Sequence, residues 1–209
     1  MNIYDISMMV KYSMPVYKNR DEKRPRLTVS RDFDSGGVYE SRIQMDLHCG
    51  THLDAPLHTV RGGKTIPAQD LVQVVSRCKV IDFTHLPEKI GQVELAASEI
   101  GAGDFILFKT KNSYIDSFDP DFVYLTADGA EFLKEKGVSG VGIDALGVER
   151  NQPGHPTHTI LFTAGIAILE GLRLADVKPG EYFLFAAPLK IHNAEAAPVR
   201  AILIEGINL

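Results

Sequence analysis

The segment from His48 to His58 constrains this chain more than any other stretch of its sequence. Four side chains of metal-ligating types stand at even positions in it, namely His48, His52, Asp54 and His58. On an extended strand, side chains separated by even numbers of residues point to the same face. A helix is disfavoured here by the flexible Gly50, the β-branched Thr51 and the proline at position 56. The spacing therefore predicts an extended segment that presents its polar side chains together.

Imidazole nitrogens and a carboxylate are the ligands of zinc, manganese or iron sites. The extended interpretation places Gly50 between the first two imidazoles, where its missing side chain leaves room for an ion. Pro56 is expected to end the strand and turn the chain, so that His58 lies beside the cluster. A lone histidine on an apolar face is usually a core residue, but three within eleven positions beside an acid indicate a metal site. Cys49 is expected on the opposite face as a small buried apolar residue.

The complete segment matches the pattern His-x-Gly-Thr-His-x-Asp-x-Pro-x-His. It resembles the signature of the cyclase family of metal-dependent hydrolases, which includes bacterial kynurenine formamidases and isatin hydrolases. The resemblance extends over nearly the whole chain, in the family's order. Its further segments are Asp5-Ile6-Ser7, the stretch from His158 to Leu172, Ala187-Pro188-Leu189 and Ala197-Pro198-Val199-Arg200-Ala201.

The resemblance implies a second ligand segment that contains His158 and Glu170. These residues are twelve positions apart, a spacing that says little by itself because both could be ordinary surface residues. In the implied two-metal site, His48, His52 and Asp54 hold one ion. Asp54, His158 and Glu170 hold the other, and the two oxygens of Asp54 bridge the ions. Zinc, two ions per chain, is the leading expectation and manganese the alternative.

We assign His58 to proton transfer, because hydrolysis of an amide requires a proton on the departing nitrogen. A histidine has an ordinary pKa near about 6.5 and can both accept and return such a proton. The alternative is that His58 is a third protein ligand of the first metal. His155 is expected in a loop near the site, whereas His85 and His192 are expected to be structural or solvated.

Tyr17 is the expected substrate-binding residue. In the formamidases that this chain resembles, a tryptophan followed by Pro-Gly-Asp lines the pocket, and Tyr17 fills that aromatic position here. The chain contains no tryptophan, and Lys18-Asn19-Arg20 replaces the Pro-Gly-Asp. Tyr17 can stack on an aryl ring. Lys18 or Arg20 could meet a substrate carboxylate, or belong to a solvated basic loop.

Three functions are compatible with these residues. The first is an arylformamidase-like metal-dependent hydrolase that converts N-formylkynurenine to kynurenine and formate, as in tryptophan catabolism. The second is an isatin hydrolase-like enzyme that opens a cyclic amide, imide or lactone. The third is a metal-binding protein without catalysis, which the His and carboxylate ligands disfavour because structural zinc sites are usually closed and rich in cysteine.

The composition narrows the setting of this activity. A chain of 209 residues suits one domain, residues 1–209. Its net charge of −5 gives no reason to expect nucleic acid or an anionic membrane as partner, so a small molecule is expected. The sequence shows no signal peptide, no transmembrane run and only two cysteines, which favours the cytoplasm. Family resemblance alone implies a homo-oligomer, either a dimer or a tetramer.

Short β-type runs outnumber helix signals, and the two alternate in the second half. The predicted fold is therefore α/β with a curved or barrel-like mixed sheet and few helices. The resemblance implies a swivelling β/α barrel-like core. Strands are expected over Arg26–Ser30, Ile43–Leu47, Cys78–Phe83, Phe105–Thr110, Gly140–Asp144, Glu181–Ala186 and Val199–Glu205. Helices are expected from Thr126 to Gly137, from Glu94 to Glu99 and from Thr157 to Phe162.

Overall fold

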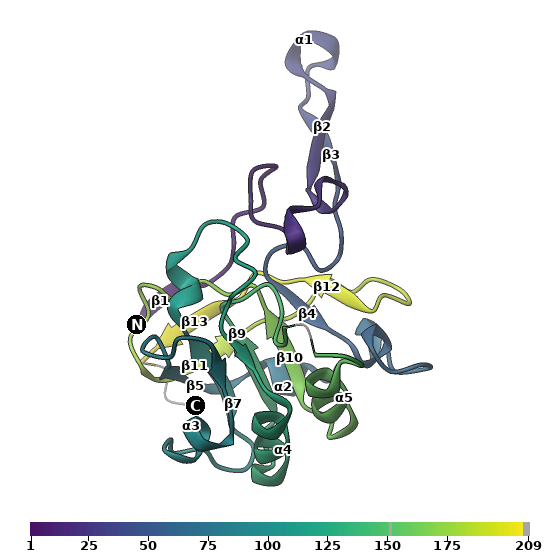
Figure 1. The fold of residues 1–209 in the computed structure, drawn as a ribbon. Helices are drawn as coiled ribbons and strands as arrows, with labels where there is room; N and C mark the ends of the chain where they lie inside the picture. The colour runs from purple at the N-terminus through teal and green to yellow at the C-terminus, as the bar shows by residue number, and fades with distance from the viewer. Residues whose placement is uncertain (151, 207–209) are drawn as a thin grey trace.

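The apolar runs of the sequence form the centre of a nine-stranded mixed sheet in the computed structural model, which describes residues 1–150 and 152–206 (Figure 1). Its strands are β1 (Asn2–Asp5), β4 (His52–Asp54), β5 (Val75–Asp82), β7 (Phe105–Lys109), β9 (Gly140–Ile143), β10 (Ala167–Glu170), β11 (Gly180–Phe185), β12 (Ala196–Pro198) and β13 (Ile202–Glu205). Their order across the sheet is β1-β13-β11-β5-β7-β9-β10-β4-β12. The pairs among β5, β7, β9 and β10 are parallel and the others antiparallel, so the expected mixed sheet is confirmed.

Both faces of the sheet are buried at its centre, which explains why strands such as β7 read as continuous apolar runs. Phe105 and Leu107 of β7 point into one core cluster, inside the curl of the sheet. Ile106 and Phe108 alternate with them and pack into a second cluster, on the side covered by helices. The two clusters have opposite strand parity, so the parity of a residue decides which core it joins.

The helices lie mainly on the outer face of the curled sheet (Figure 1). They are α1 (Phe33–Gly36), α2 (Leu71–Val74), α3 (Gln92–Ala96), α4 (Ala127–Lys136) and α5 (Pro156–Thr163). The expected start and stop of α4 are confirmed: the Thr126 side chain accepts from the backbone N–H of Gly129, and Gly137 ends the helix in a left-handed conformation. The helix expected over Glu94–Glu99 instead spans α3, two residues earlier and shorter. No helix among the described residues has the length and apolar character needed to cross a bilayer.

The sheet curls until its two ends are linked by a few residues of chain. The single strand expected over Val199–Glu205 was wrong, because β12 ends at Pro198 and β13 begins at Ile202 near the opposite end of the sheet. The residues between them cross from one end to the other. Val199 donates its backbone N–H to Thr51, and Ala201 accepts from Ile6. The α/β class with a half-barrel sheet is therefore confirmed by the strand order and this crossing.

A two-stranded arm projects from the body and is shown at the top of Figure 1. It consists of β2 (Arg26–Arg31), α1 and β3 (Glu40–Gln44), which pair only with each other in the described part of the chain. The strand expected over Ile43–Leu47 begins three residues earlier and ends before Met45. A second small sheet pairs β6 (Lys89–Ile90) with β8 (Tyr124–Leu125). Short 3-10 helices complete the fold: η1 (Tyr17–Asn19), η2 (Asp21–Lys23), η3 (Pro56–His58), η4 (Ile66–Ala68) and η5 (Lys111–Tyr114).

Candidate metal centre

Strand pairing brings the two predicted ligand segments together. β4 and β10 are antiparallel neighbours, with Glu170 opposite His52 and Ile168 opposite Asp54. Because directly opposed residues of a ladder point to the same face, Glu170 joins His52 and Asp54 on the outer side of the sheet. Leu53, between them in sequence, points to the inner core. The even spacing of the sequence therefore places both polar residues of β4 on the helix-covered face.

The extended conformation expected from His48 to Asp54 was wrong in its first half. Only His52–Asp54 forms a strand, and His48 lies in a turn where its backbone N–H donates to the Asp46 side chain. Gly50 does not leave room for an ion. It has φ of +75°, and a Cβ there would lie 2.9 Å from the end of the Met14 side chain. Gly50 thus permits the turn that carries the chain into β4.

A second glycine allows the two ligand segments to approach closely. Gly171 follows Glu170 with φ of +70°, and a Cβ on it would lie 2.1 Å from the carbonyl oxygen of Gly50. The Thr51 hydroxyl donates to the Gly171 carbonyl oxygen at 2.6 Å and accepts from the Met8 backbone N–H. The Gly-Thr pair of the motif therefore has a structural role, which is to hold β4 and the end of β10 against each other.

Helix α5 supplies His158, which points to the same cluster from the helix side. Its Nδ1–H donates to Glu149 Oε1 at 2.9 Å, so its Nε2 faces Asp54 and Glu170. His155 Nδ1 contacts the same oxygen at 2.7 Å, and the Thr157 backbone N–H donates to Glu149 Oε2. Glu149 therefore fixes the orientation of His158, as carboxylates commonly do for metal-bound histidines.

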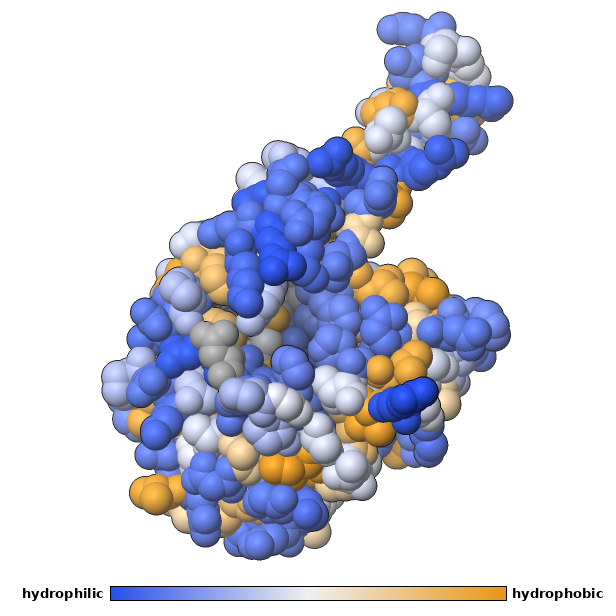
Figure 2. Space-filling model, turned by 45° about the vertical axis from the view of Figure 1, so that its right-hand side comes forward, coloured by the Kyte–Doolittle hydropathy of each residue, from blue (hydrophilic) through white to orange (hydrophobic). Residues whose placement is uncertain are grey.

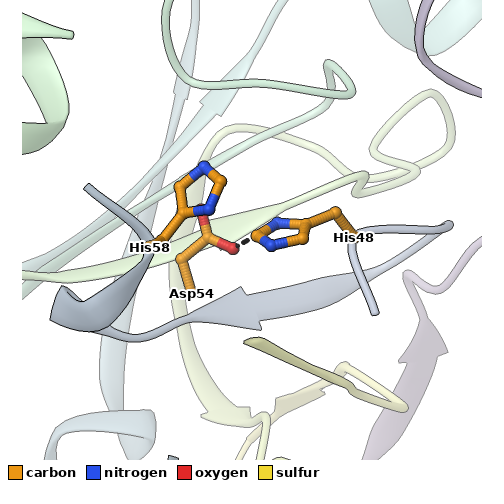
Figure 3. A group of neighbouring side chains, drawn as sticks. All are labelled: His48, Asp54 and His58. Carbon is orange, nitrogen blue, oxygen red and sulfur yellow. Dashed lines mark ion pairs between the residues drawn. The ribbon is translucent and has the colours of Figure 1, made fainter. Parts of the chain in front are cut away.

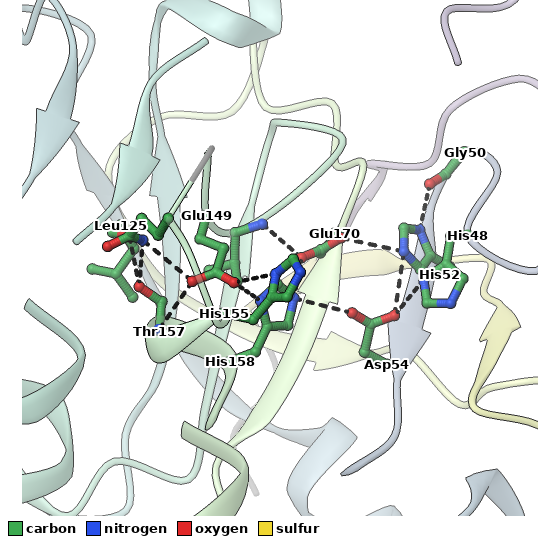
Figure 4. Close-up of polar contacts among 12 residues, drawn as sticks. His48, Gly50, His52, Asp54, Leu125, Glu149, His155, Thr157, His158 and Glu170 are labelled. Carbon is green, nitrogen blue, oxygen red and sulfur yellow. Dashed lines mark hydrogen bonds and ion pairs between the residues drawn. The ribbon is translucent and has the colours of Figure 1, made fainter. Parts of the chain in front are cut away.

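Asp54 lies at the centre of the cluster (Figure 4). Its Oδ1 is 2.9 Å from His48 Nδ1 and 3.4 Å from His52 Nε2, and its Oδ2 is 3.6 Å from His158 Nε2. Glu170 repeats the pattern, with Oε2 3.3 Å from His52 Nε2 and Oε1 3.5 Å from His158 Nε2. Asp54 thus faces three imidazoles and Glu170 faces two, and the two oxygens of each carboxylate face different imidazoles. The five predicted metal ligands are brought together, whereas their binding of metal stays a prediction.

The donor atoms of this cluster fit a divalent cation. His52 donates from Nδ1 to the Gly50 carbonyl oxygen at 2.8 Å, which directs Nε2 into the cluster. That Nε2 and both Asp54 oxygens are buried, and among the described residues none of the three has a partner in hydrogen-bond geometry, although imidazoles lie within ion-pair distance. Buried polar atoms are almost always paired, and a buried carboxylate without hydrogen bonds is costly. A cation between these atoms would satisfy all three.

The same proximity perturbs protonation. Burial alone lowers the pKa of His52, but contacts with Asp54 and Glu170 outweigh burial and raise it to about 10. Burial and the neighbouring Asp54 raise the pKa of Glu170, yet His158 and His52 bring it down to about 2. Without a cation, the carboxylates are therefore anions and the His52 imidazole is protonated, so metal binding would displace that proton.

His48 and His58 lie on either side of the Asp54 carboxylate (Figure 3), and both line the cavity beside the cluster. Their ring centroids are 4.2 Å apart, and the His58 ring is 5.5 Å from that of His158. His48 Nε2 lies 3.5 Å from Glu195 Oε1, on the side away from Asp54. As expected, the chain turns at Pro56 into η3 and places His58 beside the cluster. His58 also has a nitrogen close to ligand atoms of His48 and Asp54, so the alternative of a third ligand stays open.

A cavity of about 620 Å³ opens over these residues, and its lining includes His58, His158 and Glu170. Tyr17 of η1 lies on its wall, with its ring edge-on to Phe118 at 5.4 Å between centroids. Figure 2 shows the hollow between the body and the base of the arm, bordered mostly by hydrophilic residues. The predicted substrate-binding residue therefore lies in the same cavity as the cluster.

Glu149 and Glu195 were missed by sequence reasoning. Glu149 is nine positions before His158, and Glu195 follows β11 by ten positions, so neither has a motif spacing to the histidine it contacts. Cys49 is buried as expected, with Sγ 3.5 Å from Met14 Sδ and away from the cluster. His85 and His192 are exposed, as expected.

Comparison with known proteins gives a consistent picture. Residues 4–150 match the family model described as "Putative cyclase". A kynurenine formamidase of Salinibacter ruber is 36% identical over 97% of both chains. A solved structure described as a potential metal-dependent hydrolase with cyclase activity is 48% identical, with a TM-score of 0.90 over 97% of this chain and 96% of the other. Isatin hydrolase A from Ralstonia solanacearum shares the fold, with a TM-score of 0.85 at 23% identity over 98% of this chain and 92% of the other.

Proposed function

Because this chain belongs to the cyclase family of metal-dependent hydrolases, we propose that it hydrolyses the amide bond of an aryl formamide, with N-formylkynurenine as the leading candidate. The observation that carries this proposal is the pair of buried carboxylates, Asp54 and Glu170, which face imidazole nitrogens beside an open cavity that Glu170 lines. A site that is buried at its ligands and open on one side suits catalysis better than structural metal binding.

We propose two metal positions that share Asp54. One is formed by His48, His52 and Asp54, and the other by Asp54, His158 and Glu170. This division is supported by the separate approach of the two Asp54 oxygens, one toward His48 and His52 and the other toward His158. Zinc is the leading ion and manganese the alternative, since imidazole and carboxylate ligands suit both.

A divalent cation held there would lower the pKa of water and polarise the substrate carbonyl. The protein's own residues supply the remaining steps. His58 accepts a proton from the attacking water and returns it to the departing amide nitrogen, so that a neutral amine leaves rather than an amide anion. Support comes from its position. His58 lies on the cavity wall next to the cluster, and among the described residues no hydrogen bond occupies its ring.

The alternative function is the opening of a cyclic amide, imide or lactone by the same machinery. It is favoured by one observation, the replacement of the formamidase-type Pro-Gly-Asp by Lys18-Asn19-Arg20 beside Tyr17. Tyr17 is proposed to contact an aryl ring in either case, because its ring lies on the cavity wall. A non-catalytic metal-binding protein is disfavoured by the cavity and by the additional histidine.

The proposal is tested by assaying the zinc-loaded or manganese-loaded full-length protein on N-formylkynurenine, formanilide and a neutral cyclic imide. Release of formate from the formamides is expected. Ring opening without formamide turnover would transfer the function to the alternative. No turnover of either class, together with stoichiometric metal, would support a binding protein.

We further propose that residues 1–209 act as one hydrolase domain in the cytoplasm, as a homo-oligomer that acts on a small molecule. The arm supports self-association. All its residues from Arg26 to Gln44 are exposed, including the apolar Leu27, Val29, Phe33, Tyr39 and Ile43. An isolated two-stranded hairpin is marginally stable in water. A standard interface uses roughly 20–30 residues a side, which the arm nearly supplies by itself.

Light scattering tests this assembly. The unmodified chain is expected to have the mass of a dimer or tetramer, and a Leu27→Ser/Phe33→Ser variant the mass of a smaller species. A monomeric mass for the unmodified chain at micromolar concentration would refute self-association.

A further inference from the structure

Two basic side chains at the rim of the cavity have no anionic partner. Lys18, Arg20 and Lys23 all contribute to the cavity wall. Lys23 forms an ion pair with Asp46 at 2.9 Å. Within residues 1–150 and 152–206, neither Lys18 nor Arg20 has a carboxylate within ion-pair distance, and the Lys18 Nζ instead lies 5.3 Å from the centroid of the Tyr17 ring.

The acids of the same cavity do not neutralise these cations. Glu170 faces His52 and His158 and accepts the Val148 backbone N–H at 2.6 Å. Glu149 accepts from His155, His158 and the Thr157 backbone N–H. The carboxylates of the cavity therefore contact histidines and backbone N–H groups, whereas the two cations at its rim have no carboxylate partner among the described residues.

The backbone that carries these cations is held in an unfavourable conformation. Lys18 has φ of 56° and Asn19 has φ of 50°, so two successive residues with a Cβ adopt the left-handed region. Such residues are uncommon, and they cluster at ligand-binding sites. As a result of this turn, the side chains of Tyr17, Lys18 and Arg20 all line the same cavity.

We propose that Lys18 and Arg20 bind a carboxylate of the substrate, at the end opposite the bond that is cleaved. The substrate class is then an acidic aryl amide, with its ring against Tyr17 and its carboxylate at the rim. Lysine and arginine form charge-assisted hydrogen bonds with carboxylates. The chain as a whole has a net charge of −5, so a local positive rim is needed to attract an anionic substrate. This inference rests on the proposed amide hydrolysis and specifies its substrate.

The test compares N-formylkynurenine with its carboxamide, which differs only in the loss of the carboxylate charge. Metal-loaded protein is assayed as the unmodified chain, as Lys18→Gln/Arg20→Gln, and as Lys89→Gln/Lys136→Gln. The last variant removes the same charge from two exposed lysines that do not line the cavity. The rim variant is expected to raise KM for the carboxylate substrate about tenfold with kcat little changed, since charged hydrogen bonds contribute modestly at exposed sites. KM for the carboxamide should change less than twofold, and the control variant should alter neither.

Equal effects of the rim variant on both substrates would overturn the inference while leaving the amide hydrolysis intact. If the unmodified protein cleaves no formamide, the hydrolysis proposal fails, and calorimetric binding of kynurenine against kynurenine amide decides the inference separately. Equal affinity of the unmodified protein for kynurenine and kynurenine amide would reject the inference. A preference for kynurenine that is lost in the control variant but kept in the rim variant would also reject it. A change of molecular mass in the rim variant, with KM unaltered, would show that the cations belong to a subunit contact and would also reject it.

Discussion

Replacement of Asp54 by asparagine is the most direct perturbation of the proposed centre. The substitution keeps the side-chain volume but removes the charge that faces His48, His52 and His158 at 2.9, 3.4 and 3.6 Å. Because Asp54 is the one carboxylate proposed to contact both metal positions, its loss should weaken both. We therefore expect the Asp54→Asn chain to lose zinc and activity together.

The size of the effect can be expressed as a shift in melting temperature. A ligand at a free concentration one hundred times its Kd stabilises the folded state by about 2.7 kcal/mol. For a chain of this length, each kcal/mol corresponds to roughly 2–4 °C. Each of the two proposed zinc ions should thus raise the Tm of the metal-free protein by roughly 5–11 °C. If Asp54→Asn weakens binding at both positions a hundredfold, the same zinc concentration contributes about 0.4 kcal/mol, or roughly 1 °C, for each ion.

Calorimetry of chelator-stripped protein, with and without zinc, measures this difference, and elemental analysis counts the bound ions. Asp144→Asn is a matched control, because Asp144 is a buried carboxylate whose oxygens accept from Thr110 and Ser113 rather than facing the cluster. The control should lower the Tm of the metal-free protein and keep the full zinc-dependent rise. An Asp54→Asn protein that retains both the rise and two zinc equivalents would refute Asp54 as the shared ligand.

The remaining predictions concern roles and stability. His58→Ala should retain metal and lose about 10²–10⁴-fold in turnover, and loss of one metal equivalent instead would identify His58 as a ligand. Partial desolvation at the cavity wall and the neighbouring His48 and His158 rings lower the pKa of His58, despite the opposite effect of Asp54. Because the base must be neutral, the acidic limb of kcat/KM against pH should have its midpoint below about 6.5, and a midpoint above that value would contradict the assignment. Tyr17→Ala should raise KM for aryl substrates more than it lowers kcat, and robust turnover of N-formylkynurenine with unaltered KM would count against the contact. Gly171→Ala should destabilise the fold by more than about 2 kcal/mol in urea unfolding, since a Cβ there meets the Gly50 carbonyl oxygen and φ is positive; a smaller loss would mean that the backbone can relax.

Local physical chemistry decided several features that the sequence could predict. Thr126 and Gly137 carry the cap chemistry that starts and ends α4, and the structure has the helix between them. Alternation along β4 places His52 and Asp54 on one face whatever the rest of the chain does. The apolar run of β7 requires a strand buried on both sides, which implies helices over one face of the sheet.

Other features depended on segments that meet only in the folded chain. His48 approaches Asp54 through a turn at Gly50, because packing against Met14 and the contact with Gly171 fix that backbone, and no strand periodicity encodes either contact. Glu149 reaches His158 from the loop after β9, and Glu195 reaches His48 from the chain entering β12. The order of the strands in the sheet, rather than the spacing of residues in the sequence, decides which histidine each of these glutamates contacts.

The sequence by itself determined which residue types could bind a metal, because ligand chemistry is a property of side chains. Only the tertiary structure decided that β4, β10 and α5 converge, so that buried oxygens and nitrogens of the predicted ligands face one another beside a cavity that Glu170 and His158 line. It also decided that Lys18 and Arg20 stand at the rim of that cavity without acidic partners among the described residues. Whether a charged side chain is paired or available to a ligand depends on the residues around it, and the fold brings many of those residues from distant parts of the chain.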